Sequence, residues 1–166
     1  TIAYLNAVYA RVGDTFIRTE VHQLRRIGHT VHTFSVREAK ASERIFQEIR
    51  DEHAQTDYIL RHGVLRLLGC AIFELLRAPR RSFSALALAT RCGWPRIKGR
   101  LWPYACLLEA CYLSRQLRQK QVDHLHDHNG QGCAFVAMLA SELSGVPYSL
   151  TIHGPGEFDR PTLLAL

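Results

Sequence analysis

The chain has 166 residues, 47% of them hydrophobic and 22% charged, which is ordinary composition for one globular domain with a buried core. Its five cysteines are an odd number and none forms a Cys-x-x-Cys pair, which argues against a disulfide framework and favours reduced thiols in the cytoplasm. The net charge of +6 suggests an anionic partner, and no apolar run is long enough to span a bilayer. Because the chain begins with Thr1 and stops soon after a polar turn, we interpret it as a fragment of a longer protein.

The first part of the chain has the pattern of a strand, a helix and a second strand. Residues 1–5 are an apolar run, and a loop over 6–14 follows. Residues 15–28 have apolar side chains at helical spacing and end at Gly28, whereas residues 30–36 alternate and are rich in β-branched side chains. Two strands joined by a helix within about 35 residues predict a βαβ unit and therefore a parallel sheet.

The middle of the chain, about 43–121, is predicted to be a helical insertion. Helical patterns cover 43–52, 62–77, 82–91 and a stretch from Pro103 to about Gln121, with a brief strand possible at 57–60.

Basic residues gather in this middle part. Seven of them and no Asp or Glu lie between Leu75 and Leu108, interleaved with Phe83, Trp94, Trp102 and Tyr104. A solvated basic face is one interpretation, and a peripheral face on an anionic membrane surface is another. No nucleic-acid-binding motif accompanies the block, so we expect no nucleic acid partner. The basic residues are Arg77, Arg80, Arg81, Arg91, Arg96, Lys98 and Arg100.

Alternation of strand and helix resumes in the last part of the chain. Residues 122–126 and 148–152 are predicted strands, and residues 132–145 are a helix that ends at Gly145. The whole chain, residues 1–166, therefore predicts a single doubly wound α/β domain with a parallel sheet.

Three polar loops follow predicted strands, at 6–14, 127–132 and 153–161. Ligands of open α/β sheets bind beyond the carboxyl ends of the strands, so we expect these loops to meet at one edge. The first loop contains only Gly13 and lacks the Gly-x-Gly-x-x-Gly pattern of dinucleotide-binding proteins. Gly13 can still let a phosphate or a sugar hydroxyl approach the backbone, although Asp14 would oppose a phosphate and a plain helix cap stays an alternative.

The end of the preceding strand and the second loop together contain the run His-Leu-His-Asp-His-Asn, residues 124–129. Strand alternation puts His124, His126 and His128 on one side of the chain and Asp127 on the other. We interpret His124 as structural and expect His126, Asp127, His128 and Asn129 to contact a ligand, with a purely structural role for all four as the alternative. Zinc needs about four ligands and no second ligand pair is visible, so we predict no metal site.

The third loop begins with His153, and Gly154 and Gly156 follow it. A histidine at a strand end beside flexible backbone can donate a hydrogen bond to a sugar or a phosphate.

These loops together resemble the N-terminal domain of bacterial family-4 glycosyltransferases, nearest to the exopolysaccharide and colanic-acid type. The resemblance covers residues 2–36 and 122–159 and not the helical middle. The residues that carry it are Tyr9, Val12, Thr15, Phe16, Ile17, Arg18, Glu20, Gly28, His29 and Val31, and the run from His124 to Asp159. The chain departs from the wider superfamily by having Val12-Gly13 in place of a Gly-Gly pair.

The resemblance implies the N-terminal, Rossmann-like half of a GT-B fold, with a C-terminal donor domain absent from this chain. It implies a retaining enzyme of polysaccharide biosynthesis that moves a sugar from a nucleotide-sugar donor to a saccharide or lipid-linked acceptor, without metal or cofactor. Such a protein would be cytoplasmic or peripheral on the inner face of the membrane, and this chain alone would be inactive. Carried over by position, donor contacts fall on Gly13, His153 and Gly154, cleft contacts fall on Tyr9, His126, Asp127, His128 and Asn129, and no catalytic residue is assigned. A non-catalytic saccharide-binding module that acts with a separate partner domain is the alternative.

Overall fold

The computed structural model contains one five-stranded sheet in which every strand pairs in parallel, in the order β3-β2-β1-β4-β5. The structure describes residues 1–91, 97–128 and 132–152, without the side chains of 97–100. The strands are β1 (Ile2–Tyr9), β2 (Val31–Glu38), β3 (Asp57–Tyr58), β4 (His124–His128) and β5 (Tyr148–Thr151).

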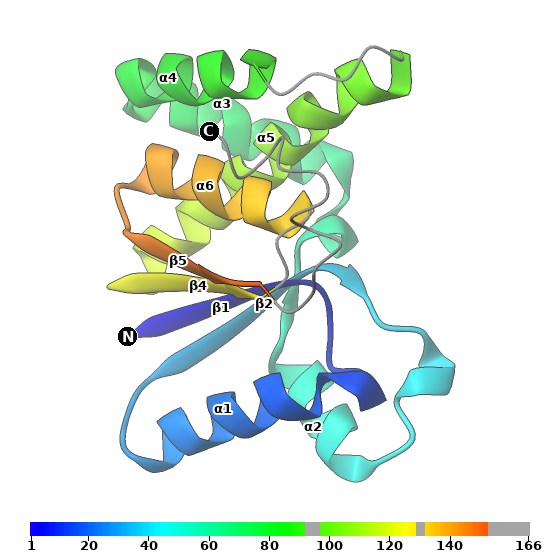
Figure 1. Cartoon of the computed structure of the whole chain (residues 1–166). Coiled ribbons are helices and arrows are strands. Elements are labelled where there is room, and N and C mark those ends of the chain that lie inside the picture. Colours follow the sequence, from blue (N-terminus) through cyan, green and yellow to red (C-terminus); the bar gives the residue numbers. More distant parts are fainter. Residues whose placement is uncertain (92–96, 129–131, 153–166) are drawn as a thin grey trace.

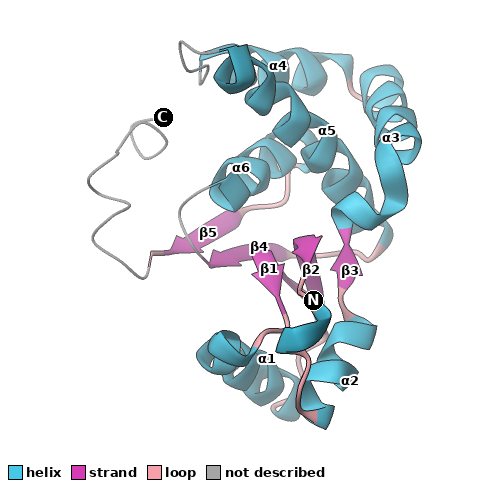
Figure 2. Ribbon diagram, turned by 90° about the vertical axis from the view of Figure 1, so that its right-hand side faces the viewer, coloured by secondary structure: helices cyan, strands magenta, loops and turns pink. Residues whose placement is uncertain are grey.

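Helices cover both faces of the sheet (Figure 1; Figure 2). One face, called here the α1 face, carries α1 and α2, and the opposite α6 face carries the other four helices. This arrangement confirms the predicted doubly wound, Rossmann-like α/β fold. The helices are α1 (Thr15–Arg26), α2 (Gln47–Gln55), α3 (Gly63–Arg77), α4 (Pro79–Arg91), α5 (Ile97–Gln119) and α6 (Gly132–Ser144).

The two faces of the sheet differ in chemistry. The α6 face has the larger core, in which Leu5, Phe34 and Leu125 of three neighbouring strands are fully buried under the helices. The α1 face has a smaller apolar cluster around Ile17 and Val21 of α1. Because strand side chains alternate, each strand can contribute apolar residues to one face and polar residues to the other.

Strand β1 is longer than its sequence pattern predicts. Residues Asn6 to Tyr9 were expected in a loop, yet they continue the strand, and Tyr9 is paired with Glu38 of β2. The polar side chain of Asn6 hides this continuation in the sequence, because a buried strand normally reads as an apolar run.

Two prolines mark the helices of this segment. Pro79 is the first residue of α4, where its missing N–H has no helical partner to lose, and it follows directly on the end of α3. Pro103 does not begin α5, because that helix starts at Ile97 and carries Pro103 inside it.

The segment predicted as a helical insertion belongs to the sheet architecture. It supplies the edge strand β3, the helix α2 on the α1 face and three helices on the α6 face. An ion pair between the fully buried Glu74 of α3 and Arg118 of α5 ties two of these helices together.

Glu109 of α5 generates a prediction about the pH dependence of stability. Burial raises the pKa of this carboxyl group to about 7, against a smaller opposing effect of the Arg37 guanidinium. Since the folded-state pKa is above the unfolded value of 4.5, the contribution of Glu109 to stability is complete below about pH 4.5 and is lost as the pH rises through about 7.

We therefore expect the free energy of unfolding of the wild type, relative to Glu109→Gln, to fall by up to about 3 kcal/mol between about pH 4 and pH 8. Urea unfolding at a series of pH values measures this difference. Glu48→Gln, at an exposed position of α2, controls for the loss of one carboxylate. A difference that stays constant with pH would show that Glu109 titrates normally.

Candidate functional site

The carboxyl ends of β1 and β4 lie side by side at the point where the strand order reverses. The chain leaves β1 toward β2 on one side, and β4 pairs with β1 on the other side. Their paired residues include Asn6 with His128 and Tyr4 with His126. In open α/β sheets this reversal creates the crevice in which ligands bind.

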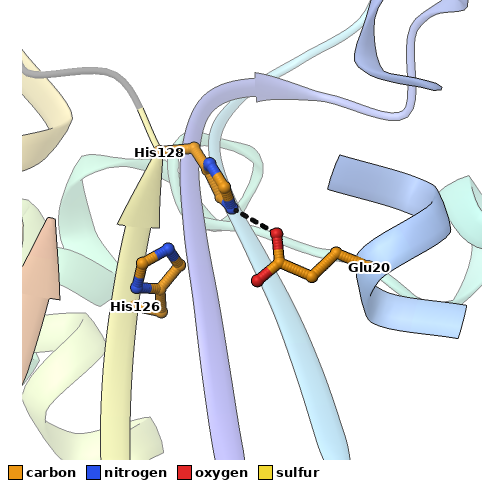
Figure 3. A group of neighbouring side chains, drawn as sticks. All are labelled: Glu20, His126 and His128. Carbon is orange, nitrogen blue, oxygen red and sulfur yellow. Dashed lines mark ion pairs between the residues drawn. The ribbon is translucent and has the colours of Figure 1, made fainter. Parts of the chain in front are cut away.

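Tyr4, Glu20, His126 and His128 converge on the α1 face near this reversal, and Figure 3 shows three of them, Glu20, His126 and His128. The Tyr4 hydroxyl donates to Glu20 Oε1 at 2.6 Å, and Glu20 Oε2 lies 3.4 Å from His128 Nε2. The ring of Tyr4 stacks on His128 at 5.6 Å, and the rings of His126 and His128 meet edge to face at 4.6 Å. We call Tyr4, Glu20, His126 and His128 the switch-point cluster.

The cluster combines a buried and an open side. The His128 side chain is 2% exposed, whereas the Glu20 side chain is 46% exposed. Burial of Tyr4 and its hydrogen bond to the Glu20 carboxylate both raise the pKa of the Tyr4 phenol. Tyr4 therefore stays a neutral donor that orients one carboxylate oxygen, and the other oxygen faces the histidine.

Strand β5 holds the His126 ring. His126 Nδ1 lies 2.7 Å from Ser149 Oγ, and His126 Nε2 lies 3.2 Å from Thr151 Oγ1. The same Ser149 hydroxyl is 2.7 Å from His124 Nε2. A hydroxyl has one proton and two acceptor lone pairs, so Ser149 can donate to only one of the two neutral rings and accepts from at least one of them. When it donates to one ring and accepts from the other, the hydrogen bonds from Thr151 to His124 all run in one direction or all in the reverse direction.

Asn6 is the most unusual residue near the cluster. It is fully buried, and alternation along β1 places its side chain on the same face as that of Tyr4. Within residues 1–91, 97–128 and 132–152, neither its amide nitrogen nor its amide oxygen has a hydrogen-bond partner. A buried amide without partners costs about 1–3 kcal/mol, so it calls for a ligand or a water molecule at this point.

Asp127 occupies the opposite face of the sheet, as alternation predicts. It is fully buried, and burial together with the charge and hydrogen bond of Asp127 raises the pKa of the Cys133 thiol in α6. Asp127 therefore belongs to the packing of α6 on β4 and not to the switch-point cluster.

The first loop is shorter than expected and contains the 3-10 helix η1 (Val12–Asp14). Asp14 does not cap α1 with its side chain, since its two carboxylate oxygens accept hydrogen bonds from the Arg11 guanidinium at 3.0 and 3.3 Å. This pairing neutralises the charge that was expected to repel a phosphate. Gly13 is exposed, and a Cβ atom there would meet nothing within 4 Å.

The remaining predicted site residues divide into two groups. Tyr9 is fully buried at the end of β1, packed in the core of the α1 face. Asn129, His153 and Gly154 lie outside the described residues, so the predicted meeting of the third loop with the other two stays a prediction.

Sequence reasoning overlooked much of the cluster. Glu20 appeared only as part of a family pattern, and Tyr4, Asn6, Ser149 and Thr151 were assigned no role. Polar residues at every second position of β1, β4 and β5 were a usable signal, because in a sheet they mark one polar face.

Comparison with known proteins identifies no relative: no family model, no curated protein and no solved structure matches this chain. The family resemblance of the sequence therefore stays a prediction, whereas the structure shows the fold class.

The shared hydroxyl generates a prediction about Ser149→Ala. Losing this hydroxyl removes hydrogen bonds to two rings, so we expect a destabilisation of about 1–2 kcal/mol and a change of tautomer at both His124 and His126. Nitrogen NMR shifts of the imidazole rings report the tautomers. Thr151→Val is the matched control. We expect its largest change in nitrogen shift at His126, the ring that Thr151 contacts directly. A change confined to one ring in Ser149→Ala would contradict the shared bond.

Proposed function

We propose that this chain is the acceptor-side domain of a retaining glycosyltransferase with a GT-B fold, which moves a sugar from a nucleotide-sugar donor to a saccharide or lipid-linked acceptor in polysaccharide biosynthesis. The observation that carries the proposal is the switch-point cluster together with the buried Asn6, at the edge where such sheets bind ligands. The resemblance of the sequence to family-4 enzymes supports it.

The cluster has the chemistry of a hydroxyl-binding site. In this proposal His126 and His128 exchange hydrogen bonds with sugar hydroxyls, and Asn6 supplies one donor and one acceptor. The Glu20 carboxylate accepts from a further hydroxyl on the open side. These groups orient the acceptor, and orientation accelerates transfer only to the extent that the contacts strengthen in the transition state.

The donor contacts in this proposal lie at the first and third loops. The exposed backbone at Gly13, next to the start of α1, approaches the donor phosphates, and the Arg11–Asp14 pair leaves little net charge there. His153 and Gly154 complete the donor contacts.

The variant Gly13→Ala tests whether Gly13 is needed for ligand binding or for folding. The structure has room for the added Cβ, so we expect an unchanged unfolding temperature. A donor that approaches the backbone closely would be obstructed, and nucleotide-sugar binding should weaken about tenfold, or about 1.4 kcal/mol. Calorimetric titration with uridine- and guanosine-diphosphate sugars measures the binding.

Gly69→Ala in α3 is the matched control, because a Cβ there also meets nothing within 4 Å. If a saccharide binds but no nucleotide sugar does, the result would favour the saccharide-binding module. Absence of both would refute the proposed function.

The outer face of α3 supports the finer part of the proposal, a contact with an anionic membrane surface. This helix buries Leu67 and Cys70 but also exposes a second apolar stripe on the opposite side. Single exposed apolar residues are ordinary, whereas a continuous apolar stripe marks a surface that binds something. The stripe consists of Val64, Leu65, Leu68, Ile72, Leu75 and Leu76.

Charge favours a lipid surface as the partner. Arg66, Arg77 and Arg80 are exposed on α3 and α4, and the only acidic residue of these two helices, Glu74, is buried against Arg118. An apolar stripe with basic neighbours suits the boundary between anionic headgroups and acyl chains. Separately, none of the helices in the described ranges combines the length and apolarity needed to cross a membrane.

We expect the chain to sediment with phosphatidylglycerol vesicles and only weakly with phosphatidylcholine vesicles. The quadruple variant Leu65→Ser, Leu76→Ser, Arg77→Glu, Arg80→Glu should lose at least about tenfold in partition, since each basic residue contributes about 1 kcal/mol near such a surface. Ile27→Ser with Arg26→Glu, exposed at the end of α1 on the other side of the sheet, is the matched control. Equal binding by both variants, or binding insensitive to added salt, would exclude this surface.

A further inference from the structure

Three side chains of the switch-point cluster can reach a single point. Glu20 of α1 and His126 and His128 of β4 each offer one ligand atom, and these atoms all lie within 4.8 Å of one another. In Figure 3 the two rings and the carboxylate turn toward one another from a helix and a neighbouring strand. Two imidazole nitrogens and one carboxylate oxygen are a ligand set that suits zinc.

We propose that Glu20, His126 and His128 bind one divalent transition-metal ion of the zinc class, with the remaining coordination position open to water or to a bound ligand. The inference is independent of the proposed function, and it differs from the metal-free expectation that the family resemblance carries. Sites with three protein ligands and one open position are the type in which zinc acts on a ligand and not only on the fold.

The spacing of the ligand atoms supports this inference. Two ligands of a tetrahedral zinc ion are about 3.4 Å apart, as follows from metal–ligand distances of about 2.1 Å. His128 Nε2 and Glu20 Oε2 are 3.4 Å apart. The 4.8 Å limit for the whole group is wider, so the exposed Glu20 side chain or the His126 ring closes in when the ion binds.

Residues behind the ligands hold them in suitable orientations. Metal-binding histidines usually donate their other ring N–H to a nearby acceptor, which fixes the tautomer. His126 Nδ1 lies 2.7 Å from Ser149 Oγ and can donate to it, which leaves Nε2 for the ion in exchange for its contact with Thr151. The Tyr4 hydroxyl binds Oε1 of Glu20 at 2.6 Å and leaves Oε2 for the ion.

The competing interpretation is an ion pair between Glu20 and a protonated His128. Such a pair needs no metal and would hold α1 against β4 in the same geometry. The two interpretations differ in what added metal does, because an ion pair gains nothing from zinc.

The test is a titration of the chelator-treated chain with Zn²⁺ by calorimetry and with Co²⁺ by visible absorption. We expect one ion per chain, a dissociation constant of about 1 μM or lower, and a Co²⁺ spectrum of nitrogen and oxygen ligands without thiolate charge transfer. Saturating Zn²⁺ should raise the unfolding temperature, because a ligand that binds only the folded state stabilises it.

Glu20→Gln and His128→Gln should each weaken binding at least tenfold. Glu20 is exposed, so its variant keeps the test valid if the buried His128→Gln variant fails to fold. His29→Gln is the control, because His29 is an exposed histidine that does not belong to the group. No binding, binding that Glu20→Gln leaves unchanged, or a thiolate spectrum would overturn the inference, and none of these outcomes bears on nucleotide-sugar binding measured without metal.

Discussion

The parallel pairing of β1 with β4 is the constraint on which the rest of the structure depends. It joins two strands that are far apart in the chain, and it places their carboxyl ends together where the connections leave to opposite sides. The register decides which side chains meet, because Tyr4 lies opposite His126 and Asn6 opposite His128. A shift of one residue would turn these polar groups into the apolar core under α6 and expose Leu125 in their place.

The asymmetry of the sheet follows from this pairing. One face is mainly apolar beneath four helices, and the other carries tyrosine, histidine, serine and threonine side chains beside a small apolar cluster. Polar groups in such positions are tolerated because most of them bond to one another, as Ser149 does with two rings. Among the described residues Asn6 departs from this rule, as does the buried Tyr9 hydroxyl, so the polar face is incomplete near the carboxyl end of β1.

The sequence predicted most of the architecture and part of the site. Residues 15–28 and 132–145 have a clear helical period and glycine stops, and the structure contains α1 and α6 there. The end of β1 was missed because Asn6 breaks an apolar run, and its place in a strand depends on pairing with β2 and β4. The histidines of β4 were placed correctly by alternation alone. Glu20 was not, since the contact of α1 with β4 depends on how the helix packs on the sheet, which no local pattern contains.

The Ser149 hydroxyl lies between two imidazoles and links His126, in the middle of β4, to His124 at its amino end. When Thr151 donates to His126, a neutral His126 donates to Ser149, and Ser149 can pass its own proton to His124; the second arrangement runs in the reverse direction. Hydrogen bonds in such a row polarise one another, so the row behaves cooperatively. A ligand that binds Nε2 of His126 selects one direction of the hydrogen bonds. The change in tautomer can then reach His124, at the amino end of β4, without movement of the backbone.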